Sequence, residues 1–442
     1  MIKATKFDIV IVLIILVLLS LGLFGLPFFM LASAAMIFIL LTIDKSTTGV
    51  FLIWFFFNLA TIWSAIYKIN ISGLIAYGLA LICFYSVNYN HKIKFRKHIA
   101  VFIPICFLFF VFYCLGPMHS YSNEKMIFII YKGIFFSICF IVLILNPKIN
   151  YIKLIVLILL STYQYYSYTN IELNWEGPSN FLDFGSYRIF YLGAFDKMQD
   201  QLINYQEIGL SSVIAFSFVL NLMPSNKSSK LNNLFFYLGI IASILIVLYS
   251  GSRQSLYSLP IVFFMYLFFE KRINRKKTLQ YLIISIVVIF FFIDFVYDDQ
   301  SVFKAGDGDT IAEKIHRPYE IIHALDLITQ KPLLGHGLGG FTPFYNNQRY
   351  YPHNIFLELI CEVGIIGTLI LITYLIMQLR MNKVVLSQKA KSKFLLLPVF
   401  MALLMRANLS SDLTETVYVF SFLIAWISLN NFNKKVLKNA NS

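Results

Sequence analysis

A short polar segment interrupts two apolar runs in the second half of the chain. It comprises Ser250–Gly251–Ser252–Arg253 and is followed by Gln254 and Ser255. Arginine at membrane depth is energetically costly and usually functional, although an arginine at the interface can also extend its guanidinium toward lipid headgroups. The small residues around Arg253 favour close packing of the backbone. We therefore take Arg253 as a candidate site residue, with an interfacial position as the alternative.

A second candidate, Arg317, lies in a longer polar stretch. Apolar residues at helical spacing follow it, and this pattern predicts an amphipathic helix over about 311–328. Pro318 suits the first turn of a helix, so Arg317 is expected at the helix mouth. A solvated loop position is the alternative interpretation of Arg317.

A glycine-rich run, 331–341, comes directly after this predicted helix. Four of the six residues from Gly335 to Gly340 are glycine, and His336 lies among them. Glycine permits a tight left-handed backbone and lets a ligand approach the main chain, so the run is either a structural turn or part of a binding site. Its spacing is that of neither a dinucleotide-binding loop nor a phosphate-binding loop.

A third polar group opens the apolar run that follows. Pro352 can start a helix, which would place His353 in a first turn whose free N–H groups and partial positive charge suit an anion. Asn354, Glu358 and Glu362 recur at intervals of four and form one polar stripe on that helix. Acidic residues within a span face a bundle interior or a water-filled cavity. The stripe therefore marks a cavity, whether the two glutamates bind a ligand or pair with a buried arginine.

Together these residues predict a phosphate-binding site with a proton carrier. Arginine prefers phosphate, which it can bind through two parallel hydrogen bonds, and histidine can move a proton near neutral pH. No spacing of His, Cys or Asp predicts a metal site, and the absence of a phosphate-binding loop argues against a nucleotide or other cofactor. The group to be transferred must therefore arrive already activated, for example on a lipid-linked diphosphate. The cluster comprises Arg188, Arg253, Arg317, Arg349, Arg406 and His353.

The composition determines which elements must position this cluster. Of the 442 residues, 59% are hydrophobic and 13% are charged. A soluble domain carries about 25% charged residues, so these values exclude a soluble enzyme, a disordered protein and a secreted disulfide scaffold. The sequence predicts an all-α, polytopic membrane helical bundle of about 12–14 transmembrane helices, each needing about 20 apolar residues. We expect residues 1–442 to form a single integral membrane domain.

The net charge of +14 is explained by membrane orientation. Lysine and arginine concentrate in the short loops 91–98, 270–278 and 380–393, which the positive-inside rule assigns to the cytoplasm together with both termini. A nucleic-acid partner is therefore not needed. The two longer loops, 169–204 and 298–353, then lie on the outer face, where the candidate arginines and His353 gather.

The sequence resembles the O-antigen ligase and polymerase superfamily of bacterial glycan-assembly membrane proteins. Three blocks carry the resemblance in the expected order. They are Ser250–Arg253, then Arg317 with its helix leading into Lys331–Gly339, then Pro352–Gly367, which is the most specific of the three. A weaker match covers Arg188 and Asn204 in the first outer loop.

The resemblance implies an inverting, metal-independent glycosyltransferase of the bacterial inner membrane. Such an enzyme moves a glycan from undecaprenyl diphosphate to an acceptor hydroxyl at the periplasmic face. Arg253 and Arg317 would hold the diphosphate and stabilise its leaving charge. His353 would orient or deprotonate the acceptor hydroxyl, with His336 as a second base or a spectator. To substrate binding we assign Arg188, Asn204, Arg349, Asn354, Glu358, Glu362 and Arg406.

Several functions remain open at this point. A composition rich in Asn, Ile and Lys leans toward a polymerase that extends a lipid-linked repeat unit, with a ligase that passes the glycan to lipid A-core as the alternative. A protein O-oligosaccharyltransferase is a third branch. A flippase for lipid-linked glycans would need charges along a path from both faces, whereas the polar residues crowd on the outer side. The expected partners are membrane lipids and an undecaprenyl-diphosphate-linked oligosaccharide. The resemblance also implies a chain-length regulator and a flippase.

Overall fold

The structure, a computed structural model, is helical throughout the part of the chain that it describes. The described residues are 4–52, 100–145, 149–173, 205–220, 222–223, 229–269, 280, 283, 309–341, 352, 354–381, 397–409, 419–421 and 423. No strand occurs among them, which confirms the all-α prediction. The chain divides into two compact units, which are taken one at a time below.

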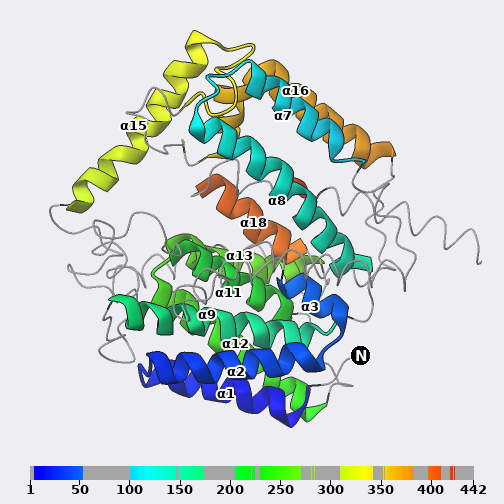
Figure 1. Cartoon of the computed structure of the whole chain (residues 1–442), viewed down its shortest axis with the longest axis vertical. Helices are drawn as coiled ribbons and strands as arrows, with labels where there is room; N and C mark the ends of the chain where they lie inside the picture. Colours follow the sequence, from blue (N-terminus) through cyan, green and yellow to red (C-terminus); the bar gives the residue numbers. More distant parts are fainter. Residues whose placement is uncertain are drawn as a thin grey trace, which may run out of the picture. The chain divides into compact units, whose positions relative to one another are not determined.

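The first unit comprises Met1–Asn90, Asn146–Gly306 and Phe394–Ala402. Its helices pack around a central one, α9 (Figure 1). They are α1 (Lys6–Ser20), α2 (Leu26–Thr42), α3 (Lys45–Phe51), α9 (Tyr151–Leu173), α11 (Tyr205–Leu220), α12 (Lys230–Ser250) and α13 (Arg253–Phe269), with the first part of α18 (Leu397–Leu409).

Helix α9 is central because its side chains are apolar or small and are covered on all sides. From Leu154 to Tyr168 every side chain is buried, as expected for a helix that is apolar around its whole circumference. Two of its polar side chains donate hydrogen bonds to neighbouring helices. Gln164 donates to Ser33 Oγ at 2.7 Å, and the Tyr166 hydroxyl donates to the Ile246 carbonyl at 2.9 Å.

The start of α1 is fixed by a capping box and an ion pair. Thr5 Oγ1 accepts from the Asp8 amide at 3.3 Å, while Asp8 Oδ2 accepts from the Thr5 amide at 2.8 Å. The other carboxylate oxygen of Asp8 accepts from Lys153 Nζ of α9 at 2.6 Å. Asp8 is buried and Lys153 is 15% exposed, so one carboxylate both starts α1 and attaches it to α9.

The second unit comprises His91–Leu145, Asp307–Lys393 and Leu403–Ser442. Its helices are α7 (Ile103–Cys114), α8 (Ser120–Leu145), α15 (Asp309–Gln330) and α16 (Ile355–Met381), with the rest of α18. Within this unit α7 packs on α8, and α16 packs on both α7 and α15. Helix α15 covers the predicted amphipathic segment, and a loop, 331–341, runs from its end to the neighbouring helices (Figure 1).

Two described helices are long and apolar enough to cross a membrane. They are α12 and the Ile355–Gln378 part of α16. Shorter apolar helices occupy Leu26–Thr42, Ile103–Cys114, Ile208–Leu220 and Gln254–Leu267. All of them coincide with apolar runs from which membrane spans are predicted. Several further predicted spans fall outside the described residues.

We predict that Asp8→Ala destabilises the first unit by about 2 kcal/mol. The change removes the capping box and leaves Lys153 without the Asp8 carboxylate; the cost stays below the ~3–5 kcal/mol of breaking a fully buried pair because Lys153 keeps partial exposure. Thermal unfolding of the detergent-purified protein measures the effect. The pair Asp8→Asn with Lys153→Met removes both charges and should recover most of the loss. An unchanged unfolding midpoint for Asp8→Ala would show that the ion pair does not hold α1.

Candidate functional site

The first sequence block forms a tight turn between α12 and α13. Gly251 ends α12 in the left-handed conformation, with φ 66°, and its amide donates to the Leu248 carbonyl at 3.2 Å. Ser252 Oγ accepts from the Ser255 amide at 3.4 Å and lies 2.9 Å from Ser255 Oγ. Helix α13 therefore begins at Arg253 behind a serine cap.

Helix α11 packs closely on this turn. A Cβ at Gly209 of α11 would come within 2.4 Å of Ser255 Oγ and 2.9 Å of Ser252 Cβ. This agrees with the close backbone packing expected around Arg253. The backbone of Arg253 is thus held at the first residue of α13 by a rigid turn, while its side chain lies outside the described residues.

The second block differs from the sequence prediction in one respect. Helix α15 begins at Asp309, so Arg317 and Pro318 lie within the helix and not at its mouth. The eight residues from Asp309 to His316 continue the helix upstream. An internal proline costs one amide donor, which a helix of this length tolerates. Helix α15 is then anchored by an apolar cluster of Ala324 and Leu327 with Phe341 and Cys361.

The glycine-rich loop docks into a break in α16. Gly364 has φ 67° and ψ 178°, which interrupts the helix and leaves backbone groups on both sides of the break without partners within the helix. The loop supplies them. The amides of His336 and Gly337 donate to the carbonyls of Cys361 and Glu362, both at 2.9 Å.

The reverse bonds complete this exchange. The amide of Ile365 donates to the Pro332 carbonyl at 2.9 Å, and that of Ile366 donates to the Leu333 carbonyl at 3.1 Å. Four backbone hydrogen bonds therefore join the loop to the broken helix. The contact is so close that a Cβ at Gly364 would come within 2.2 Å of the Leu333 carbonyl oxygen.

The loop also contacts α7 and the start of α8. The Leu338 amide donates to the Phe112 carbonyl at 3.0 Å. A Cβ at Gly337, where φ is 82°, would lie 2.1 Å from Gly116 Cα. His119 accepts at Nδ1 from the Ser122 amide at 3.0 Å, and its Nε2 lies 3.1 Å from the Gly339 carbonyl oxygen. Because a carbonyl only accepts, the Nε2 proton of His119 bonds to the loop.

His336 has a structural role in the same loop. Its ring Nε2 lies 2.8 Å from the Leu327 carbonyl oxygen of α15, and the side chain is buried. The ring therefore donates from Nε2 and ties the loop to α15. This hydrogen bond favours the spectator interpretation of His336 over that of a second base.

A buried charge cluster lies beside the docked loop. Lys125 of α8 forms ion pairs with Glu358 and Glu362 of α16, with Nζ 2.6 Å from Glu362 Oε1. None of the three side chains is more than 1% exposed. The Lys125 ammonium also lies 5.5 Å from the centre of the Tyr121 ring. The two glutamates thus pair with a buried cation, which is a lysine and not the arginine considered from the sequence.

Lys125 is the residue that the sequence analysis missed. The apolar run 126–145 predicts a membrane span, and Lys125 lies just before it, which predicts a loop position for this residue. Helix α8 begins earlier, at Ser120, which places Lys125 within the helix. The available signal was the acidic stripe itself, because two carboxylates on an apolar helix require a buried cation.

Asn354 is the N-cap of α16. Its Oδ1 accepts from the amides of Phe356 and Leu357, at 3.0 and 3.1 Å. The helix begins at Ile355, so the expected start at Pro352 is wrong. The expectation of free N–H groups in the first turn is also wrong for Phe356 and Leu357, because the Asn354 side chain takes both.

The structure brings together three of the predicted site residues on one helix. Asn354, Glu358 and Glu362 lie at the start of α16, with the last two buried. Arg253, Arg317 and Arg406 have described backbones in α13, α15 and α18, but their side chains are not described. Outside the described residues lie Arg188, Asn204, Arg349 and His353. Within the described part, no group of three or more His, Cys, Asp and Glu could hold a metal ion.

Comparison with known proteins gives a match to one family model over part of the chain. Residues 238–372 match the protein family described as O-antigen ligase. The matched segment runs from α12 through the Arg253 turn, the docked loop and the capped start of α16. A comparison with curated proteins finds no significant match.

The match confirms the resemblance to the O-antigen ligase and polymerase superfamily. Members of this superfamily are glycosyltransferase-like enzymes of surface-polysaccharide assembly. The match and the apolar helices together indicate an integral membrane protein.

We predict that Lys125→Met destabilises the second unit more than Glu362→Gln does. The first change leaves two buried carboxylates without the Lys125 ammonium, at about 3–5 kcal/mol. The second keeps the Lys125–Glu358 ion pair and leaves an amide oxygen that can still accept from Lys125, so the lost charge should cost less than the about 1.5–3 kcal/mol of a hydrogen bond to a charged group. Unfolding midpoints of the purified variants compare the two. The opposite order would show that Lys125 does not carry the cluster.

We also predict that Gly337→Ala prevents docking of the loop. The positive φ would cost alanine about 1–2 kcal/mol, and its Cβ would overlap Gly116. The total loss of folding free energy should therefore exceed about 4 kcal/mol. Gly22→Ala is the matched control, because Gly22 has φ 61° in the turn after α1 but does not contact Gly116. Yield and elution of the monodisperse protein in detergent report folding. Equal behaviour of the two variants would rule out a close loop–α7 contact.

Proposed function

We propose that the chain is a glycosyltransferase of the O-antigen polymerase type in the bacterial inner membrane. It transfers a glycan from undecaprenyl diphosphate to a hydroxyl of another lipid-linked repeat unit. The observation that carries the proposal is the family match over 238–372, which contains the Arg253 turn, the docked glycine loop and the start of α16. An O-antigen ligase that uses lipid A-core as acceptor is the alternative, and a flippase for lipid-linked glycans is a more distant one.

The proposed site lies at the periplasmic face of a polytopic bundle with both termini in the cytoplasm. This orientation follows from the distribution of Lys and Arg among the short loops. The docked loop supports a site shared by α15 and α16. Four hydrogen bonds and the His336–Leu327 contact join α15, which carries Arg317, to α16, which follows His353 in the sequence.

The reaction we propose is an inverting displacement without a metal. The acceptor hydroxyl oxygen forms a bond to the anomeric carbon while the bond from that carbon to the diphosphate oxygen breaks. His353 takes the hydroxyl proton, and Arg253 and Arg317 neutralise the charge on the leaving diphosphate. Since a diphosphate is already a good leaving group, positioning supplies much of the acceleration.

The buried cluster acts through the helix in this scheme. Lys125 holds Glu358 and Glu362 inside the second unit and so fixes the rotation of α16 about its axis. Asn354 caps the N-terminus of the helix, so α16 begins at a defined residue shortly after His353 in the sequence. These are positioning residues. The remaining proposed substrate contacts are Arg188, Asn204, Arg349 and Arg406. A chain-length regulator and a flippase are proposed partners, on the basis of the family resemblance.

We predict that deletion of the gene leaves a single repeat unit on the lipopolysaccharide core, because chain extension stops while ligation continues. Gel electrophoresis of the lipopolysaccharide reads this directly. Bare core with accumulated lipid-linked polymer would instead identify a ligase and contradict the polymerase proposal.

Complementation of the deletion strain then tests the site. His353→Ala, Arg253→Ala and Arg317→Ala should each fail to restore long glycan, with a loss of at least about 100-fold, the usual contribution of a general base or of one charge-stabilising group. The control is Tyr237→Ala, which changes an exposed side chain of α12 outside the proposed site and should restore full length. Membrane levels of each variant are compared by immunoblot. Wild-type glycan length in all three variants would refute the site.

A further inference from the structure

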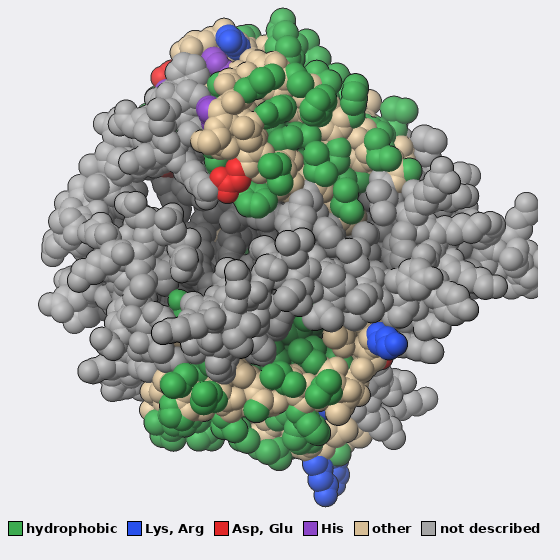
Figure 2. All heavy atoms as spheres, viewed as in Figure 1, with side chains coloured by type: hydrophobic (Ala, Val, Ile, Leu, Met, Phe, Trp, Pro, Cys, Tyr) green, Lys and Arg blue, Asp and Glu red, His purple; other side chains and the backbone are tan. Residues whose placement is uncertain are grey.

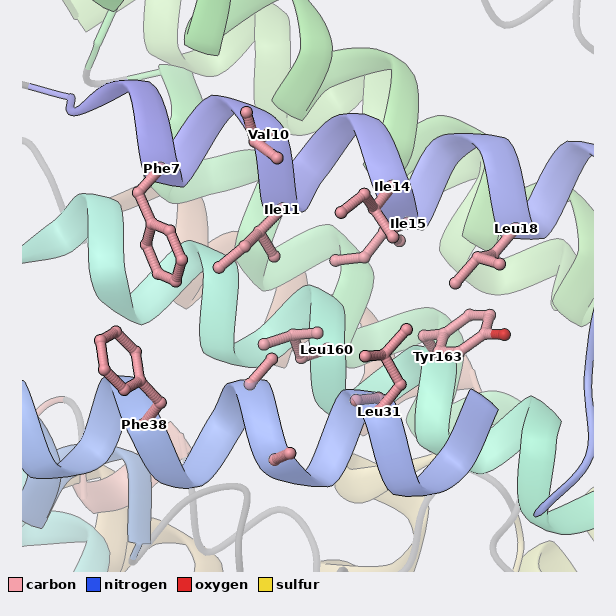
Figure 3. A pocket seen from close by; sticks show the side chains of 13 residues that line it. Phe7, Val10, Ile11, Ile14, Ile15, Leu18, Leu31, Phe38, Leu160 and Tyr163 are labelled. Atoms are coloured by element: carbon pink, nitrogen blue, oxygen red, sulfur yellow. The ribbon is translucent and has the colours of Figure 1, made fainter. Parts of the chain in front are cut away.

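A groove without polar lining side chains, apart from one buried tyrosine, runs between α1 and α2 in the first unit. Its volume is about 350 Å³. Both helices pack against α9, and their side chains point toward each other across the groove with Leu160 and Tyr163 of α9 behind them (Figure 3). Small residues of α2, Ala32, Ala34 and Ala35, leave the space open.

The groove has a buried floor and an exposed rim. Leu160, Tyr163 and Ile15 are buried at the floor, whereas Phe7 and Leu31 are 43% and 54% exposed. The groove therefore opens along its side to the surroundings of the helices. The hydroxyl of Tyr163 donates to the Leu23 carbonyl, so this residue presents only its ring to the space.

Aromatic pairs lie at the two ends of the groove. At one end the rings of Phe7 and Phe38 meet edge to face, with centres 5.5 Å apart. At the other end Phe24 stacks on Tyr163 at 5.8 Å. Along α1 the lining runs from Phe7 to Leu18, which corresponds to about 16 Å at 1.5 Å per helical residue. This matches one leaflet, because the whole hydrocarbon core is about 30 Å thick.

The Phe7–Phe38 end carries excess positive charge. Lys6 begins α1, Lys45 begins α3 directly after α2, and both are exposed. The nearby acids are already engaged: Asp8 pairs with Lys153 at 2.6 Å, and Asp44 accepts from the Thr47 amide at 2.9 Å. Basic side chains are visible on the surface of the first unit (Figure 2).

Helix α12 brings one more lysine to the same end. The Ala4 amide, just before α1, donates to Asn232 Oδ1 at 2.7 Å. This bond places the first turn of α12 beside the start of α1, and Lys230, the first residue of α12, is exposed. Anionic lipid surfaces attract such groups of lysines.

We propose that the α1–α2 groove binds one acyl chain of an anionic membrane phospholipid. The chain lies between the two helices, and the phosphate headgroup lies at the end that carries Lys6, Lys45 and Lys230. A linear hydrocarbon chain fits a narrow apolar groove one leaflet deep, and the lysines select a negative headgroup. The inference uses the membrane location of the chain and is independent of glycosyl transfer.

The test is photo-crosslinking of the full-length protein in phosphatidylcholine vesicles. The probe is a small fraction of phosphatidylglycerol that carries a diazirine on its acyl chain, and labelled peptides are quantified by mass spectrometry. We expect peptides from α1 and α2 to be labelled at least fivefold more than the α7 peptide around Phe107, which is 66% exposed and reports bulk lipid. Equal labelling would mean contact with bulk lipid only and would overturn the proposal, as would no labelling of α1 and α2.

Matched variants locate the chain within the groove. Ala35→Trp fills the groove and should lower the labelling of α1 at least fivefold. Ile37→Trp, on an exposed face of α2 outside the lining, should leave it unchanged. If Ala35→Trp does not elute as a monodisperse protein, Leu31→Trp replaces it. Unchanged labelling in the groove-filling variant would overturn the proposal.

Two further comparisons identify the ligand. Lys6→Gln with Lys230→Gln should reduce labelling by the phosphatidylglycerol probe to the level of an equivalent phosphatidylcholine probe; no reduction would refute the headgroup assignment. Unlabelled phosphatidylglycerol should compete with the probe better than undecaprenyl phosphate at an equal mole fraction. Stronger competition by undecaprenyl phosphate would assign the groove to an isoprenoid chain and overturn the phospholipid assignment.

Discussion

The break in α16 at Gly364 exposes backbone carbonyl and amide groups, and the organisation of the second unit follows from how these groups are satisfied. In a low-dielectric environment each unpaired group costs several kcal/mol. The carbonyls of Cys361 and Glu362 and the amides of Ile365 and Ile366 all bond to the loop that follows α15. The loop can approach this closely only because Gly335, Gly337 and Gly364 lack side chains. A kink in one helix thereby fixes the position of a second helix.

The same arrangement accounts for the charged residues around it. Glu362 uses its carbonyl to bind the loop and its carboxylate to bind Lys125, so it connects α8, α16 and the loop. The cluster also orients α16, because a different rotation of the helix would separate Glu358 from Lys125. The loop therefore holds α15, which carries Arg317, against the start of α16, and the proposed catalysis by positioning requires such an arrangement.

In the first unit, a buried helix and one ion pair hold the other helices in place. Helix α9 is buried on all sides, and α1, α2, α3, α11 and α12 pack against it. The Asp8–Lys153 ion pair fixes the position of α1 along α9. Helices α1 and α2 both pack against α9. The groove between them stays open because the residues of α2 that line it include three alanines. Stability and the proposed lipid site thus have the same origin in this unit.

The sequence alone determined the all-α class, the presence of the apolar helices, the amphipathic helix before the glycine run and the resemblance to the superfamily, because these depend on periodicity, composition and local motifs. It also indicated that Glu358 and Glu362 face the interior of the protein, where the structure buries both. Only the tertiary structure decided that Lys125 is their partner, that Arg317 lies inside α15, and that Asn354 and His336 bond to backbone groups. The pairing of Lys125 depends on a contact between residues far apart in the chain, and no local pattern encodes which distant cation a buried carboxylate will meet. The Asn354 cap and the start of α15 are local features, but the pattern of residue types does not fix a helix boundary to within a few residues.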